Sequence, residues 1–141
     1  MIIRRARLAD VESAAACHLA CWQEAYAGIV EPERLAGIVA KLPARVELWL
    51  RLVNSGTPPL VAIDFDKIVG FAGAGPAHED GVEADYQLHA INVRQAYWGT
   101  GIGQELIDRA IGDRSCFLWV ARDNPRAIAF YRRNRFKPDG A

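Results

Sequence analysis

The sequence predicts an α/β fold, because strand-like and helix-like segments alternate along its 141 residues. A glycine-rich turn between residues 99 and 103 follows a strand pattern and opens a helix pattern. The later apolar run 116–120 is bounded by polar residues, which is typical of a buried parallel strand. Strand, helix and parallel strand in this order form a crossover unit, so we expect an α/β sheet in a single domain spanning residues 1–141.

The first half of the chain is predicted to contain one short strand followed by helices. Apolar residues recur at three- and four-residue steps from Val11 to Tyr26, which predicts a long amphipathic helix with Asp10 as its N-cap or first-turn acid. Pro32 fits the first turn of the next helix, and Pro43 is expected to interrupt the chain before a third helical segment. The predicted elements are a strand at 2–4 and helices at 10–26, 32–39 and 44–53.

The second half is predicted to begin with a hairpin, because two β-rich runs flank the short turn 65–67. The strand that enters the glycine turn follows, and helical spacing resumes at Ile102. Pro125 fits the first turn of the last helix. The predicted elements are strands at 60–64, 68–74 and 83–93, a helix at 102–111, a strand at 116–120 and a helix at 125–133.

The composition excludes several classes of partner. Seventeen basic residues balance seventeen acidic ones, so nothing indicates a nucleic acid or an anionic membrane. No apolar run approaches the ~20 residues that span a bilayer. The first residues lack the apolar core of a signal peptide and have strand character. We therefore expect a cytoplasmic protein.

The three cysteines form no disulfide framework. Cys17, His18 and Cys21 would lie close together on one helix, which suggests a metal site. A zinc site needs four ligands, or three and a water, and no second Cys/His pair follows. We therefore predict no metal and interpret the two thiols as buried core groups.

The glycine-rich turn has the features of a phosphate site. A turn of this kind leaves backbone N–H groups exposed at the positive end of a helix dipole, and its glycines keep side chains out of the way. It is not a P-loop, because Gln104 and Glu105 follow Gly103 where Lys and Ser/Thr are required. It is also one residue shorter than the dinucleotide fingerprint. A strand-to-helix turn that needs its glycines only for geometry remains an alternative.

Two blocks resemble the GNAT acyltransferase superfamily. The segment 97–103 is similar to its pyrophosphate loop, Gln/Arg-x-x-Gly-x-Gly/Ala, with Trp98 in place of Gln/Arg. The segment 124–136 is similar to its Asn-x-x-Ala-x-x-x-Tyr block and the Gly-Phe that follows, with Arg135 in place of Gly. The resemblance covers nearly the whole chain. It implies a GNAT (acyl-CoA N-acyltransferase) fold, a mixed central sheet flanked by helices, with acetyl-CoA as the acyl donor.

The resemblance also assigns site residues. Strand amides would face the thioester carbonyl and the amides of the glycine turn would hold the pyrophosphate. Tyr131 would protonate the leaving thiolate, unless it is only a core tyrosine, and Asn124 would cap its helix, bind the pantetheine arm or do both. The cofactor-binding residues expected on this basis are Ile91, Asn92, Val93, Gly99, Thr100, Gly101, Ile102, Gly103, Gln104, Asn124 and Tyr131.

The general base is left open by the sequence. Many family members carry a glutamate at the position of Gln87 or of Trp119, and neither residue here accepts a proton. Strand alternation predicts that Asp85, Gln87 and His89 share a face with Ile91 and Val93. Asp85 and His89 are therefore the candidate bases. Glu83 is expected on the same side, and Glu24, on the predicted first helix, is a less favoured candidate. A water relay, with His89 as a core histidine, is the alternative. Arg94 either assists electrostatically or is a solvated strand-end arginine.

We conclude from the sequence that the chain is an N-acetyltransferase. It would move an acetyl group from acetyl-CoA to a primary amine of a small molecule or protein by direct attack in a ternary complex. The acceptor is not identified, because Trp22, Tyr26 and Trp49 fit an apolar acceptor site or the core equally well. Two alternatives are a catalytically weak acyl-CoA-binding module and, since relatives usually continue for another hairpin, a truncated domain active as an edge-paired homodimer.

Overall fold

The computed structural model describes residues 1–26, 31–39, 41–76, 86–112, 116, 118 and 125–136. Within these ranges, no helix combines the length and the apolar character needed to cross a membrane. The strands are β1 (Ile2–Arg5), β2 (Leu60–Asp64), β3 (Lys67–Pro76) and β4 (Tyr86–Val93). The helices are α1 (Val11–Tyr26), α2 (Pro32–Val39), α3 (Leu42–Val53), α4 (Ile102–Ile111) and α5 (Pro125–Arg133), and Leu8–Asp10 and Gln95–Tyr97 form 3-10 turns.

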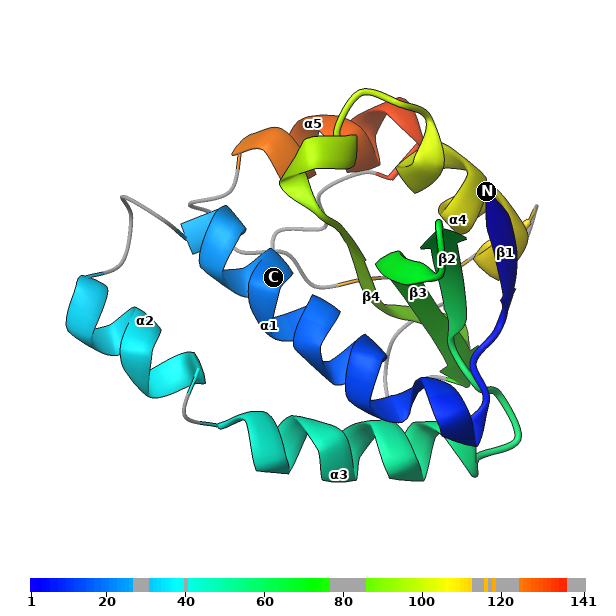
Figure 1. Cartoon of the computed structure of the whole chain (residues 1–141). Coiled ribbons are helices and arrows are strands. Elements are labelled where there is room, and N and C mark those ends of the chain that lie inside the picture. Colours follow the sequence, from blue (N-terminus) through cyan, green and yellow to red (C-terminus); the bar gives the residue numbers. More distant parts are fainter. Residues whose placement is uncertain are drawn as a thin grey trace.

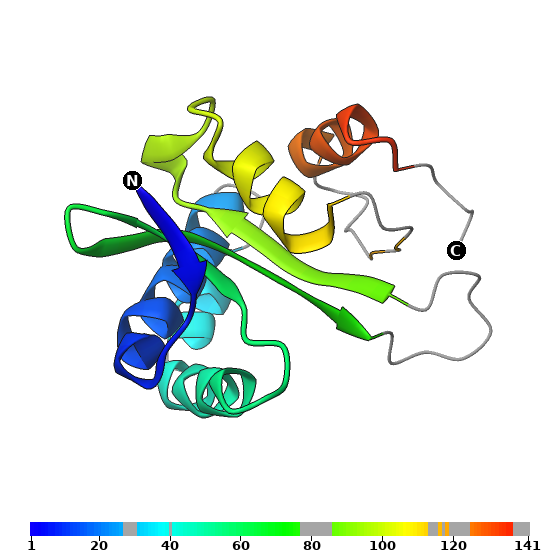
Figure 2. The same ribbon diagram turned by 90° about the vertical axis from the view of Figure 1, so that its right-hand side faces the viewer.

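The described strands form an antiparallel sheet in the order β1-β2-β3-β4. Helices α1 and α3 cover one face of this sheet, and α4 and α5 lie on the other (Figures 1 and 2). The β2–β3 hairpin turns at Phe65 and Asp66, both of which have positive φ, as in the primed turns that suit the twist of a hairpin.

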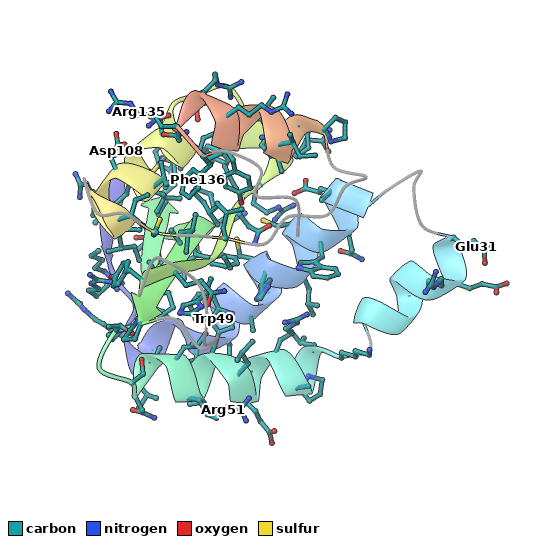
Figure 3. The ribbon with its side chains drawn as sticks, turned by 180° about the vertical axis from the view of Figure 1, so that it is seen from behind. Glu31, Trp49, Arg51, Asp108, Arg135 and Phe136 are labelled. Carbon is teal, nitrogen blue, oxygen red and sulfur yellow. The ribbon has the colours of Figure 1, made fainter. Side chains whose placement is uncertain are left out.

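Each face of the sheet has its own core. On the α1/α3 face, Trp49 is 1% exposed and packs against Phe71, beside the buried thiols of Cys17 and Cys21 (Figure 3). On the α4 face, Leu106 and Ile107 are buried against the sheet. The prediction that Cys17 and Cys21 are buried thiols is confirmed.

Most of the predicted elements are confirmed within a residue or two. One correction concerns Pro43, which does not interrupt the chain, because α3 begins at Leu42 and accommodates the proline in its first turn. Asp10 is the first-turn acid of the 3-10 turn, where it accepts the Arg7 N–H at 2.7 Å. The predicted strand 116–120 lies outside the described residues except for Cys116 and Leu118, and so do residues 83–85 of the predicted fourth strand.

Helix α5 ends in a Schellman motif. The N–H of Phe136 donates to the carbonyl of Tyr131 at 3.0 Å, and the N–H of Arg135 donates to that of Arg132 at 3.1 Å. The rings of Tyr131 and Phe136 meet with centroids 5.8 Å apart, which is the apolar contact that accompanies this motif, and Phe136 lies beneath α5 (Figure 3). The motif requires a left-handed residue, and Arg135 supplies it with φ of 69°.

We predict that Arg135→Gly stabilises the fold by about 1 kcal/mol, because glycine adopts positive φ without the Cβ clash that arginine meets there. Thermal and urea unfolding measure the gain. Arg135→Ala is the control, since it removes the same charge but keeps a Cβ. A gain of equal size in the alanine variant would show that charge, not backbone strain, is responsible.

A buried histidine predicts a pH dependence of stability. His18 is 8% exposed, and its Nδ1 accepts a hydrogen bond from Trp49 Nε1 at 3.3 Å. Burial and the charge of Arg45 lower the pKa of His18 to about 4. The unfolded chain therefore binds this proton first, so stability that is complete above about pH 6.5 is lost as the pH falls toward 4, by at most about 3 kcal/mol.

We expect His18→Asn to flatten this loss, because its Oδ1 can replace Nδ1 as the acceptor and does not titrate. Urea unfolding at several pH values between 4 and 7 measures the difference in slope between the two proteins. Equal slopes would show that His18 is not the group responsible.

Candidate functional site

The glycine turn joins the end of β4 to the start of α4. Gly99 and Gly101 have φ of 77° and 91°, a region that favours glycine, and Gly101 is the N-cap of α4. The first helical hydrogen bond runs from the Glu105 N–H to the Gly101 carbonyl at 3.0 Å. The amides of residues 102–104 precede this bond, so they are available to a ligand at the positive end of the helix dipole. This geometry fits a phosphate group.

Trp98 fixes the start of the turn to the strand. Its indole N–H donates to the Val93 carbonyl at 2.8 Å, across the short 3-10 turn that separates them. Arg126, in the first turn of α5, lies over the indole with its guanidinium carbon 3.5 Å from the ring centroid. The turn is therefore in contact with α5 as well as with β4.

Two carboxylates hold the same segment from other elements. Glu24 on α1 accepts hydrogen bonds from Arg94 Nε at 2.9 Å and from the Gln95 N–H at 3.0 Å. Asp64 at the end of β2 accepts a hydrogen bond from the Tyr97 hydroxyl at 2.7 Å. The Arg94 side chain is thus paired with Glu24.

Glu24 is poorly suited to be the base. Burial by itself would raise the pKa of its carboxyl, but the hydrogen bonds from Arg94 and the Gln95 N–H outweigh burial and leave that pKa below its ordinary value. A carboxylate held in this way takes up a proton only under acid conditions. Its contacts indicate that it positions the turn.

A β-bulge in β4 changes which residues share a face. Gly73 pairs with Ala90 and Ala74 pairs with Leu88, so His89 is an extra residue in the strand. As a result, Leu88 lies with Ile91 and Val93 on the α4 side, and Ala90 packs on the α1 side. The prediction that Gln87 and His89 share a face with Ile91 and Val93 is therefore wrong, because the extra residue reverses the alternation.

The bulge places His89 on the face opposite α4. Its Nε2 lies 3.6 Å from the position that a Cβ on Gly75 would take, and Gly75 pairs with Gln87. His89 is an exposed residue. The Oε1 atom of Gln87 is buried, and no residue in the described part of the chain donates to it. Gln87 and His89 are thus polar neighbours on the α1 side of β4.

Tyr131 lies on the opposite side of the strand. It packs against the core on the α4 face together with Ile91 and Val93. Its ring contacts Phe130 and Phe136 with centroid distances of 5.6 and 5.8 Å. Burial raises the pKa of its phenol to about 12, so the hydroxyl keeps its proton throughout the physiological range. A phenol in this state is a proton donor.

Helices α4 and α5 are in direct contact. A Cβ on Gly103 would lie 3.5 Å from the ring of Phe130, the residue before Tyr131. Gln104 Nε2 donates to Asn134 Oδ1 at 2.6 Å and to Asp108 Oδ1 at 2.9 Å, so the Gln104 side chain points toward the end of α5. The backbone amide of Gln104, not its side chain, therefore remains for the ligand.

In the structure the predicted turn follows the end of β4, and Tyr131 packs on the α4 face of the sheet, the face that the turn leads into. Asp85 and Asn124 lie outside the described residues. Arg126 was not predicted, because no short-range pattern indicates that a residue of α5 stacks on Trp98. The anchors between Glu24 and Arg94, which are 70 residues apart, were not predicted for the same reason.

Comparisons with known proteins bear on this site. The family described as the acetyltransferase (GNAT) family has a model that matches residues 14–136. A protein of Mycobacterium tuberculosis, named as a probable N-acetyltransferase, is 29% identical over 149 aligned positions, which cover 98% of this chain and 80% of that protein.

Solved structures are similar over almost the whole chain. The PaiA N-acetyltransferase of Thermoplasma acidophilum, in complex with coenzyme A, is 25% identical with a TM-score of 0.78, covering 99% of this chain and 92% of that one. The ribosomal-protein-alanine N-acetyltransferase of Brucella melitensis is 26% identical with a TM-score of 0.69, covering 99% and 86%. The predicted fold class is confirmed.

Proposed function

The chain belongs to the acetyltransferase (GNAT) family and is an N-acetyltransferase with acetyl-CoA as acyl donor, and on this premise we propose how its residues divide the reaction. The acetyl group passes to a primary amine of a small molecule or protein by direct attack in a ternary complex. The observation that carries the proposal is the contact of the glycine turn with α5, because Tyr131 of that helix packs on the same side of β4 as Ile91 and Val93.

Backbone amides do most of the binding. The predicted set runs from Gly99 to Gln104; the Thr100 N–H donates to the Tyr97 carbonyl at 3.3 Å, and the other amides of the set take the pyrophosphate at the N-terminus of α4. Among the described strands β4 is the last in the sheet, so alternate amides of Ile91, Asn92 and Val93 point away from β3. One of these amides polarises the thioester carbonyl and stabilises the oxyanion that forms on it. Asn124 completes the cofactor site.

Proton transfer is divided between the two sides of the strand. Tyr131 protonates the leaving thiolate, which its neutral phenol supports. His89 takes the proton from the attacking ammonium, directly or through a water, and Asp85 is the second candidate for this role. The buried Oε1 of Gln87 supports an acceptor site on the same face, because it suits an N–H or water donor.

We extend the proposal to the setting of the enzyme. We propose that the enzyme works in the cytoplasm, and that a homodimer is one candidate for its active form. A weak acyl-CoA-binding module is the second function considered, since the two glutamate positions of the family hold Gln87 and Trp119.

We expect the chain to bind acetyl-CoA in the micromolar range and Gly101→Glu to lose that binding by at least about 100-fold. The new carboxylate would face the phosphates at the point where the amides converge. Titration calorimetry measures both affinities. Gly101→Ala is the control, because it carries the same penalty for positive φ without the charge, and we expect it to keep measurable binding.

Absence of binding by the folded wild-type chain would contradict the proposed cofactor site. Loss of binding in Gly101→Ala to the same extent as in Gly101→Glu would show that the backbone geometry of the turn, and not charge, limits binding. Circular dichroism on each variant establishes that it is folded.

We predict that Tyr131→Phe lowers kcat by about 100-fold and leaves the KM for acetyl-CoA nearly unchanged, because the ring contacts remain and only the proton donor is lost. Thiol release measures the rate with a panel of a diamine, an amino sugar and a peptide with a free amino terminus.

In the pH–rate profile of the wild-type enzyme, a histidine base predicts that the rate falls at acid pH. We expect His89→Asn to remove this fall. A wild-type chain that binds acetyl-CoA but turns over no amine would favour the binding module.

A further inference from the structure

Arg126 is an exposed residue whose guanidinium lies beside the glycine turn. Its guanidinium carbon lies 3.5 Å from the centroid of the Trp98 ring, which is contact distance for two stacked planar groups. Trp98 in turn donates its N–H to the Val93 carbonyl at 2.8 Å. The guanidinium is therefore fixed relative to the end of β4 through one stacking contact and one hydrogen bond.

Stacking uses the face of the guanidinium and leaves its donors unused. The five N–H groups lie in the plane of the group, and they suit the paired oxygens of a phosphate or carboxylate. Arg4, Arg94 and Arg109 each pair with a carboxylate, on Asp10, Glu24 and Glu105. Among the described residues, no carboxylate lies within salt-bridge distance of Arg126.

The described part of α5 and the residues that end it carry only positive charge. The described segment Pro125–Phe136 contains Arg126, Arg132, Arg133 and Arg135 and no acidic residue. Burial and the charge of Arg133 lower the pKa of the Arg126 guanidinium, as expected for a cation that is partly desolvated beside another cation. Helix α5 lies next to α4 on the same face of the sheet (Figure 2). An anion at this place would relieve both costs.

We propose that the guanidinium of Arg126, held on Trp98, contacts a phosphate of the coenzyme A moiety seated on the glycine turn. The inference rests on the proposed function, because it takes the turn as the seat of that cofactor. Trp98 occupies the position where the family pattern has Gln or Arg. Two phosphate groups fit this chemistry, the pyrophosphate and the 3′-phosphate of the cofactor.

Titration calorimetry with acetyl-CoA tests the contact. A hydrogen-bonded charge pair of this kind predicts that Arg126→Ala weakens binding about 10- to 100-fold. Arg126→Lys keeps the charge but loses the planar fork, so we expect an intermediate loss. Arg132→Ala is the matched control, since it removes one exposed arginine from the same helix, and we expect its affinity to stay within about twofold of wild type.

Coenzyme A and dephospho-coenzyme A distinguish the two phosphates. If Arg126 binds the 3′-phosphate, wild type and Arg126→Ala will bind dephospho-coenzyme A equally. If it binds the pyrophosphate, the loss in Arg126→Ala will be the same with both compounds. Either result supports the contact, and circular dichroism checks that α5 is intact.

Two results overturn the inference while leaving the proposed function standing. One is a wild-type chain that binds acetyl-CoA and an Arg126→Ala variant that binds it within about twofold. The other is an equal loss in Arg132→Ala, which would assign the effect to the general field of α5. A wild-type chain that binds no acetyl-CoA is a different outcome, because it contradicts the proposed function itself.

Discussion

The site depends on how the chain passes from β4 to α4. Between Val93 and Ile102 the backbone leaves a strand, makes a 3-10 turn and enters a helix, and two residues with positive φ make the change of direction. Such a segment would be free to move if it were held by its backbone alone. Carboxylates on α1 and β2, and an indole hydrogen bond to the end of β4, hold it instead. The amides at the start of α4 are thereby fixed before any ligand arrives, which lowers the entropic cost of binding.

The bulge at His89 has a second consequence for the same strand. In a regular strand, Gln87 and His89 would face the same side as Ile91 and Val93, which is the side on which Tyr131 packs. The extra residue separates them, so Tyr131 lies on the side of α4 while Gln87 and His89 lie on the side of α1. A thioester at the edge of β4 could then be approached by an amine from one side and release its thiolate on the other. Bulges are over-represented next to active sites, where they re-aim a side chain.

The sequence predicted what depends on local patterns. The limits of β2, α2, α4 and α5, the glycine turn and the buried thiols on α1 all follow from spacing, turn residues and composition. It did not predict the bulge, because the residues around His89 carry no Gly or other signal that interrupts the alternation. It also did not predict that Glu24 holds Arg94 or that Arg126 stacks on Trp98, because these contacts join residues that are far apart in the chain. Such contacts depend on how α1 and α5 pack, which no short window of sequence contains.

Two of the departures from the family pattern, at Arg135 and at Trp98, have different physical consequences. At Arg135 the backbone still forms the helix end, with its hydrogen bonds and its contact between Tyr131 and Phe136, and the substitution costs only strain. At Trp98 the side chain itself changes, and the indole becomes a support for a cation from another helix. The chain as a whole is neutral, with seventeen charges of each sign, but α5 is not. A net charge of zero is therefore compatible with a strongly positive helix beside the glycine turn, and the distribution of charge, rather than its sum, determines which ligands the surface attracts.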